Sequence, residues 1–310
     1  MTEITLVTAY FNINRKDWKG FERTDNDYLS YFRHWARMRN KLIVYTTPDM
    51  AKEVMRVRKE YGLVEKTTVI AIEDVTACVP DIYKSIKRVM LNKSSWLFHK
   101  NLNNPESWNY LYNYVTNLKT YWVQRAVSEK LASGMIAWID FGFDHGGDDF
   151  PFSEDFNFTW NCTSNLPQKI NIFLSYPLDD TPIFKVVQTM DTYIRGNLSI
   201  APDFMWIDLW KDIYGSLKSL AECGLADDDQ TLMLMAYRRH PENFVTHLVS
   251  YWGEGLRSWG GEKLRVRSEH KIVKKHTFHK LWREKRKEWK IRFDILKRHG
   301  SELEKKYYSD

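Results

Sequence analysis

Cysteine is scarce in this 310-residue chain, which has three, namely Cys78, Cys162 and Cys223, and no Cys-x-x-Cys pair. The scarcity excludes a disulfide framework and a structural zinc site of the usual spacing, and it indicates a reducing compartment. No apolar run approaches the roughly 20 residues that span a bilayer, and the first residues lack the basic and apolar regions of a signal peptide. We therefore predict a cytoplasmic protein.

Low-complexity composition is also absent, since hydrophobic residues make up 43% of the chain and charged residues 28%. These fractions exclude a collagen, a linker or a wholly disordered tail, and the length suits one large domain or two small ones. Aromatic residues are abundant at 15%, with 13 Trp and 17 Tyr. Flat rings fill cores, and they also stack on sugars and bases, so the composition suits a carbohydrate or nucleotide site.

Positive charge is concentrated at one end of the chain. Residues 262–310 carry 17 Lys and Arg against 8 Asp and Glu, whereas residues 1–261 carry 29 against 32. We predict a catalytic or binding domain over 1–261 and a basic appendage over 262–310. In the appendage, apolar residues recur at spacings of three, four and seven, which predicts an amphipathic helix. They are Phe278, Leu281, Trp282, Trp289, Phe293 and Leu296.

The basic appendage has several possible partners. Its apolar stripe could pack on its own domain or pair with a helix of another subunit, and its charge could bind an anionic membrane face. Nucleic acid is not expected as a partner, because the near-neutral body carries no matching basic groove.

Apolar, β-branched runs alternate with helical spacings along the rest of the chain. Strands are predicted over residues 4–11, 41–46, 67–72, 134–139 and 169–175. Helices are predicted over residues 28–40, 49–61, 109–131, 204–220 and 227–238. Short strands separated by helices are typical of an α/β fold with a mostly parallel sheet covered by helices.

The most informative segment is W-I-D-F-G-F-D-H-G-G, from Trp138 to Gly147. An apolar strand leads directly into Asp140, and ligands of open α/β sheets bind beyond the carboxyl ends of the strands. Asp140, with Asp144 and His145 close in sequence, could hold a divalent cation that bridges a diphosphate. Alternatively, Asp140 caps the turn that follows the strand.

Two later segments add candidate side chains. Asp227, Asp228 and Asp229 precede a predicted helix, where carboxylates favour the helix N-terminus. One of them could instead act as a general base, because neighbouring like charges raise a carboxyl pKa. His247 is either a core histidine or a metal ligand that completes a site built on Asp140.

Taken together, these segments resemble the bacterial HtrL/YibB/WlaTC family over about residues 4–252. The matching stretches are T-L-V-T-A-Y-F from Thr5, followed by Arg15, W-A-R-M-R-N-K-L-I-V-Y-T from Trp35, W-I-D-F-G-F from Trp138, and D-D-Q from Asp228. Members of the family occur among bacterial surface-polysaccharide genes, and their layout is similar to that of GT-A glycosyltransferases.

The resemblance implies a nucleotide-sugar cleft at the ends of the first strands. It implies that Thr8, Ala9, Tyr10 and Arg15 surround the nucleotide and that Lys119 faces its phosphates. GT-A enzymes hold Mn²⁺ or Mg²⁺ with a D-x-D motif, whereas Asp140-Phe141-Gly142 supplies one acid here.

For the remaining site residues, the resemblance implies that His247 is a second metal ligand beside Asp140. It also implies that Asp229 is the base that faces the acceptor, with Asp228 as the reserve.

We therefore expect a glycosyltransferase that moves a hexose, such as galactose or galactofuranose, from a UDP-sugar to a lipid-linked glycan. That glycan would belong to a lipopolysaccharide, O-antigen or capsule, and the basic appendage would suit a peripheral enzyme on the inner face of the cytoplasmic membrane. The alternative is a non-catalytic polysaccharide-assembly factor that keeps the fold and binds partners or membrane through residues 262–310.

Overall fold

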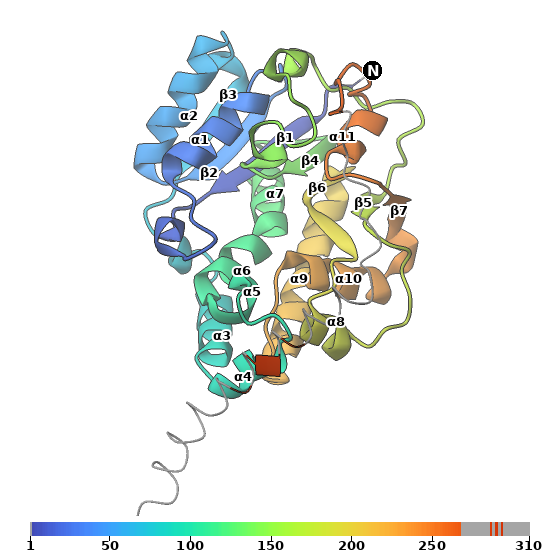
Figure 1. Cartoon of the computed structure of the whole chain (residues 1–310). Helices are drawn as coiled ribbons and strands as arrows, with labels where there is room; N and C mark the ends of the chain where they lie inside the picture. The colour runs from blue at the N-terminus through green and yellow to red at the C-terminus, as the bar shows by residue number, and fades with distance from the viewer. Residues whose placement is uncertain (1, 268–285, 287–288, 291–292, 294–310) are drawn as a thin grey trace, which may run out of the picture.

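A single seven-stranded sheet organises the chain in the computed structural model, which describes residues 2–267, 286, 289–290 and 293 (Figure 1). The strand order is β3-β2-β1-β4-β6-β5-β7. The strands are β1 (Thr5–Tyr10), β2 (Leu42–Thr46), β3 (Thr67–Ala71), β4 (Met135–Ile139), β5 (Ile170–Leu174), β6 (Ile194–Pro202) and β7 (Phe244–Leu248).

The sheet is mostly parallel, as the sequence predicts. β1 runs parallel to β2 and β4, β2 runs parallel to β3, and β5 runs parallel to β7. β6 is antiparallel to both β4 and β5. Every residue of β2, β4 and β5 is buried, which is why these strands read as continuous apolar runs in the sequence.

Helices flank the sheet, and most of the longer ones match predicted segments. The helices are α1 (Asp25–Trp35), α2 (Pro48–Glu60), α3 (Pro80–Met90), α4 (Lys93–Phe98), α5 (Pro105–Trp108), α6 (Tyr110–Asn117), α7 (Lys119–Ser128), α8 (Ile183–Thr189), α9 (Asp203–Glu222), α10 (Asp229–Arg239) and α11 (Glu254–Ser258). The helix predicted over residues 109–131 is broken at Leu118, so that α7 begins at Lys119.

The two faces of the sheet bury separate apolar clusters. Along β4, Ile136 and Trp138 join one cluster, while Ala137 and Ile139 join the other, as alternation along a strand requires. The first cluster includes residues of α3, α7, α9 and α10, and the second includes residues of α1, α2 and α11. In Figure 1, α1 and α2 lie beside β2 and β3, and α9 and α10 lie toward β5 and β7. The α/β fold with a helix-covered sheet is thus confirmed.

Two strands are not among the predicted ones, namely β7 and, closer to Asp140, β6. Its sequence, I-R-G-N-L-S-I-A-P, contains Gly196, Asn197 and Pro202, which are depleted in strands and read as loop residues. Tertiary pairing with β4 and β5 outweighs this local preference. The consequence for function is direct, because β6 lies next to the strand that leads into Asp140.

Much of the basic appendage lies outside the described residues, including four of its predicted apolar positions, Phe278, Leu281, Trp282 and Leu296. Trp289 and Phe293 are described as helical and are 71% and 67% exposed. Closer to the body, the Arg265 guanidinium pairs with Asp155 at 2.8 Å. Among the described residues, no helix has the length and apolar character that a bilayer span needs.

Candidate functional site

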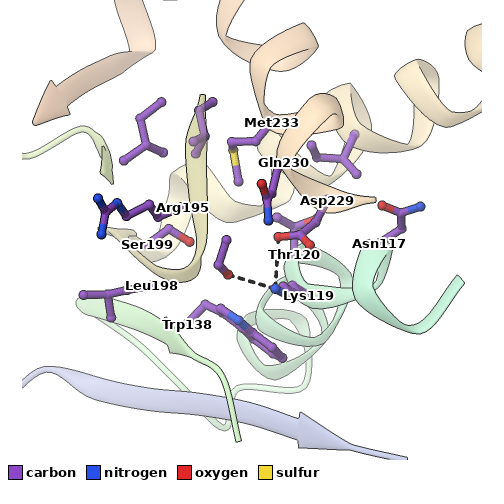
Figure 2. Close-up of a pocket in the computed structure, with 14 residues that line it drawn as sticks. Asn117, Lys119, Thr120, Trp138, Arg195, Leu198, Ser199, Asp229, Gln230 and Met233 are labelled. Carbon is purple, nitrogen blue, oxygen red and sulfur yellow. Dashed lines mark hydrogen bonds and ion pairs between the residues drawn. The ribbon is translucent and has the colours of Figure 1, made fainter. Parts of the chain in front are cut away.

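Lys119 is the centre of a charged cluster at the carboxyl edge of the sheet. Its Nζ atom lies 3.1 Å from Asp140 Oδ1 and 3.0 Å from Asp229 Oδ2, and it donates a hydrogen bond of 2.9 Å to the Gly196 carbonyl. These acceptors match the three N–H groups of an ammonium. Figure 2 shows the Lys119 side chain directed at Asp229 within the pocket that both line. The fold thus brings together three residues far apart in the sequence.

Asp140 follows β4, where the sequence places it. Its carboxylate accepts a 2.8 Å hydrogen bond from the Trp138 indole Nε1, two residues earlier, besides contacting Lys119. The side chain remains 33% exposed, so a ligand can reach it. Asp140 therefore faces the open edge of the sheet, which is where an α/β fold binds ligands.

The three acids before α10 divide into different roles. Asp228 is the N-cap residue, and its side chain accepts a 3.1 Å hydrogen bond from the Gln230 amide. Asp227 accepts a 2.7 Å hydrogen bond from the Thr231 hydroxyl. Asp229, the first residue of α10, alone of the three is ion-paired to Lys119. Asp227 and Asp228 thus stabilise the start of α10, whereas Asp229 belongs to the charged cluster around Lys119.

Burial shifts the protonation of these groups. It raises the pKa of Asp229 above the usual aspartate value, while Lys119 opposes the shift and Asp140 adds to it. Burial likewise raises the pKa of Asp228, with Asp229 and Asp227 as further causes. For Lys119, burial would lower the pKa, but Asp140 and Asp229 outweigh it and hold the pKa above the ordinary lysine value. Lys119 is therefore charged, and the raised pKa of Asp229 makes it a stronger base than an ordinary aspartate.

Gly196 on β6 makes the close approach possible. A Cβ atom at this position would lie 2.1 Å from Asp229 Oδ2 and 3.2 Å from Lys119 Nζ. No side chain fits there without displacing the ion pair, so the cluster depends on a glycine at this point of the strand.

The residues predicted to surround a nucleotide lie at the neighbouring end of β1. Tyr10 donates a 2.6 Å hydrogen bond to Asp25 and stacks on Phe141, the residue after Asp140. Arg15 donates a 2.7 Å hydrogen bond to the Tyr28 hydroxyl, and the rings of Tyr10 and Tyr28 are 4.7 Å apart. These contacts join the β1 end to the Asp140 region through an aromatic layer.

Thr8 and Ala9 differ in burial within β1. Thr8 is fully buried, and its hydroxyl has no hydrogen-bond partner among the described residues. Ala9 is half-buried and pairs with Tyr45 of β2. Contact of these two residues with a nucleotide stays a prediction.

Asp144 and His145, which the sequence groups with Asp140, point elsewhere. Asp144 accepts a 2.6 Å hydrogen bond from the Asp149 amide and lies 3.4 Å from His34 Nε2, in the interior. His145 lies 3.3 Å from both Arg23 and Asp148, near the surface. Asp144 therefore anchors its own loop and does not reach the Lys119 cluster.

His247 does not join Asp140. It sits on β7, three strands away from β4, a separation of about 14 Å at the usual spacing of strands. Its Nε2 is 3.0 Å from the Asn171 side-chain oxygen, and its ring stacks on Phe173. Burial lowers the pKa of His247. His247 is thus half-buried on the edge strand β7 and packs against the rings of Phe173 and Trp259, as a structural histidine does.

A divalent metal ion fits these residues poorly. The described part of the chain contains no group of three or more His, Cys, Asp or Glu residues that could hold one. Asp140 already accepts from the Trp138 indole and the Lys119 ammonium, which lies between Asp140 and Asp229. The ligand pair of Asp140 and His247 is not assembled.

Sequence reasoning missed Trp138 and Gly196, and it missed Arg195, which lines the same pocket. Arg195 is 7% exposed and stacks over Trp252 at 5.2 Å, and Figure 2 shows it directed away from Lys119. The alternation of β4 could have identified Trp138, because it shares a strand face with the position two residues later. No sequence signal marks Gly196, because β6 itself went unrecognised.

Comparison with known proteins identifies the family to which the chain belongs. The family model described as "Bacterial protein of unknown function (HtrL_YibB)" matches residues 2–259, so the chain belongs to this family. It is 30% identical over 269 residues to "Protein HtrL" of Escherichia coli (strain K12), with 81% of this chain and 88% of that protein covered. The predicted family membership is thus confirmed.

A solved structure with a similar fold is the apo form of mouse xyloside xylosyltransferase 1. The match covers 86% of this chain and 95% of that chain, with 13% identity and a TM-score of 0.42. At that level of identity the similarity concerns the fold alone.

Proposed function

We propose that the chain is a glycosyltransferase that moves a hexose from a UDP-sugar to a lipid-linked surface glycan. The observation that carries the proposal is the cluster of Lys119, Asp140 and Asp229 at the carboxyl edge of the sheet. Two carboxylates around one buried cation, next to an aromatic layer at the end of β1, suit a charged and hydroxylated ligand better than an apolar one.

In this proposal Asp229 acts on the acceptor. It takes the proton from the acceptor hydroxyl, whose oxygen attacks the anomeric carbon as the bond to UDP breaks. Its burial and raised pKa support this role, because a general base works best with a pKa near the operating pH. In a retaining enzyme the same carboxylate positions the acceptor. Asp228 is the weaker candidate, since its carboxylate caps α10.

The donor occupies the β1 side of the edge in this proposal. Tyr10 and Tyr28 offer aromatic faces to the base, and Arg15 offers positive charge to the diphosphate. Thr8 and Ala9 precede Tyr10 on β1, and their contact with the nucleotide stays a prediction of the family resemblance. Lys119 offsets negative charge beside Asp140. Mn²⁺ or Mg²⁺ remains a prediction of the family resemblance, and no step is assigned to it, because the described residues do not fit one.

Calorimetric titration with UDP and GDP, each with Mn²⁺ and with EDTA, tests the donor site. We expect UDP to bind and Asp140→Asn to weaken that binding while circular dichroism shows an unchanged fold. No nucleotide binding under either condition would contradict the proposal.

A transfer assay with the purified protein tests the base. Asp229→Ala should lower the rate by about 10²–10⁴-fold, the usual contribution of a general base. Asp208→Ala on exposed α9 surface is a matched control, because its partner is the exposed Lys211. Full activity of Asp229→Ala would show that the base is another residue.

The alternative is a non-catalytic polysaccharide-assembly factor, and the poor fit to a metal ion favours it. It predicts that no sugar nucleotide binds and that the appendage recruits a partner. The net positive charge of residues 262–310 and the exposed Trp289 and Phe293 support an anionic membrane surface as that partner. Removing residues 271–310 should release the protein from anionic liposomes, with neutral liposomes as the control. Unchanged binding would reject the membrane role.

A further inference from the structure

We propose that Lys119 is the resident cation of the site and takes the place of a divalent metal ion between Asp140 and Asp229. The site then assembles and binds its ligand without Mn²⁺ or Mg²⁺. The part of this inference that concerns the ligand rests on the proposed function, whereas the part that concerns the cation does not.

The first support is the set of atoms around Lys119 Nζ. Three oxygens surround it at 2.9–3.1 Å, and they come from Asp140, Asp229 and the Gly196 carbonyl. Carboxylate and carbonyl oxygens are also the ligands that hard divalent cations prefer. The ammonium uses its three N–H groups on these oxygens, so a metal ion cannot share the position.

The second support is that the surrounding chain is built for this arrangement. The break at Leu118 starts α7 at Lys119, and the Trp138 indole donates a second hydrogen bond to the Asp140 oxygen that Lys119 contacts. Gly196 leaves room for the ion pair, since a Cβ atom would meet both Asp229 and Lys119. Three separate elements, β4, β6 and α10, thus converge on one ammonium group.

The charges of the cluster provide a way to test the inference. With Lys119 in place, two carboxylates share one positive charge. Without it, Asp140 and Asp229 would face the same space with no cation between them, and that space would attract a divalent ion. Removing the lysine should therefore create a metal site that the natural protein lacks.

The experiment is a Mn²⁺ titration of the full-length protein, followed by the electron paramagnetic resonance signal of free Mn²⁺. Lys119→Ala should bind at least about tenfold more tightly than the natural protein, and adding Asp140→Asn to it should abolish the gain. Lys119→Arg should bind Mn²⁺ no more tightly than the natural protein, because it retains the positive charge. Lys211→Ala, which frees an exposed aspartate on α9, is the matched control and should gain no Mn²⁺ affinity.

Two results would overturn the inference. One is Mn²⁺ binding by the natural protein that disappears in Asp140→Asn. The other is a Lys119→Ala variant that binds Mn²⁺ no better than the natural protein while circular dichroism shows it folded. Should Lys119→Ala unfold, Lys119→Met keeps the aliphatic stem and serves in its place.

UDP titration separates this inference from the proposed function. Equal UDP affinity, within about twofold, in EDTA and in Mn²⁺ is the expected result. UDP binding that requires Mn²⁺ would overturn the inference and leave the glycosyltransferase standing. No UDP binding in either buffer would remove the proposed function, and the Mn²⁺ titration would still decide the role of Lys119.

Discussion

Asp140 and Asp144 stand four residues apart in one segment, yet they serve different parts of the molecule. Asp140 is one-third exposed and contacts the side chains of Trp138 and Lys119. The side chain of Asp144 is fully buried, and it accepts hydrogen bonds from the main-chain amides of Asp149 and Phe150. The first aspartate faces the open edge of the sheet and belongs to the proposed ligand site, whereas the second holds a loop in place.

The backbone at and directly after Asp144 causes the difference. Asp144 and His145 have φ angles of 62° and 42°, and the glycines at 146 and 147 also have positive φ. Positive φ is uncommon outside glycine, and these four residues form a turn in which the Asp144 carbonyl accepts hydrogen bonds from the Gly147 and Asp148 amides. Within this turn the buried Asp144 side chain meets the amides of its own loop. Residue type and spacing alone therefore do not separate a ligand-facing acid from a structural one.

Removing the Asp144 side chain, which holds its loop in place, should have the largest effect on the free energy of unfolding. Asp144→Ala leaves two buried amides without their acceptor and removes the carboxylate beside His34, so the free energy of unfolding should fall by about 3 kcal/mol. Urea unfolding followed by circular dichroism measures it. Asp140→Asn should cost less than about 1 kcal/mol, and the exposed Asp148→Ala is the control. Equal losses of unfolding free energy for Asp140→Asn and Asp144→Ala would show that the two aspartates do not differ in their structural role.

The second largest effect on stability should follow from placing a side chain in the space that Gly196 leaves for the charged cluster. Gly196→Ala places a methyl group against Asp229 and Lys119, so we expect a loss of about 2 kcal/mol in unfolding free energy together with weaker nucleotide binding. Gly215→Ala within α9 is the control, because among the described residues the added Cβ atom would meet only the guanidinium end of Arg239, at 3.3 Å. If Gly196→Ala bound nucleotide as well as the natural protein, the cluster would not be part of the ligand site.

The stability contributed by the contact between His34 and Asp144 should depend on pH. Burial would lower the pKa of His34, but hydrogen bonds to Asp144 and to the Phe150 carbonyl outweigh it and raise the pKa. Glu154 adds a smaller contribution in the same direction. The stabilisation is therefore complete below the unfolded pKa of about 6.5 and is lost as the pH rises through the folded value.

The expected decline in unfolding free energy is at most about 1.4 kcal/mol per pH unit, and His34→Gln should abolish it. Urea unfolding at several pH values above and below neutrality measures the slope. A slope in His34→Gln equal to that of the natural protein would assign the pH dependence to other groups.

The smallest effect should follow from changing His247. His247→Gln can keep a hydrogen bond to Asn171 and lies three strands from Asp140, so nucleotide affinity should stay within about twofold. Calorimetric titration with UDP checks this. A large loss of UDP affinity would return His247 to the ligand site that the family resemblance implied.

Much of the fold was predictable because its signals are local. Buried parallel strands such as β2 and β4 are continuous apolar runs, and α2 begins at Pro48, a residue that favours the first turn of a helix. β6 was not predictable, since its Gly196, Asn197 and Pro202 disfavour a strand locally. Its pairing depends on β4 and β5, which lie far away in the sequence.

The candidate site was predictable only in part. Asp140 was found because it ends an apolar strand, and Asp229 because acids precede a helix. The pairing of both with Lys119 was not visible, because it depends on where α7 starts relative to β4 and α10. His247 was linked to Asp140 by family resemblance, and the strand order keeps the two apart.

The sequence by itself determined the α/β class, the order of most strands and helices, and the uneven distribution of charge. These follow from apolar periodicity and composition, which each segment carries independently of the others. Only the tertiary structure decided which charged groups meet. It placed Lys119 between two carboxylates, turned Asp144 inward and left His247 among aromatic rings, because such contacts depend on backbone turns and strand order that no single segment encodes.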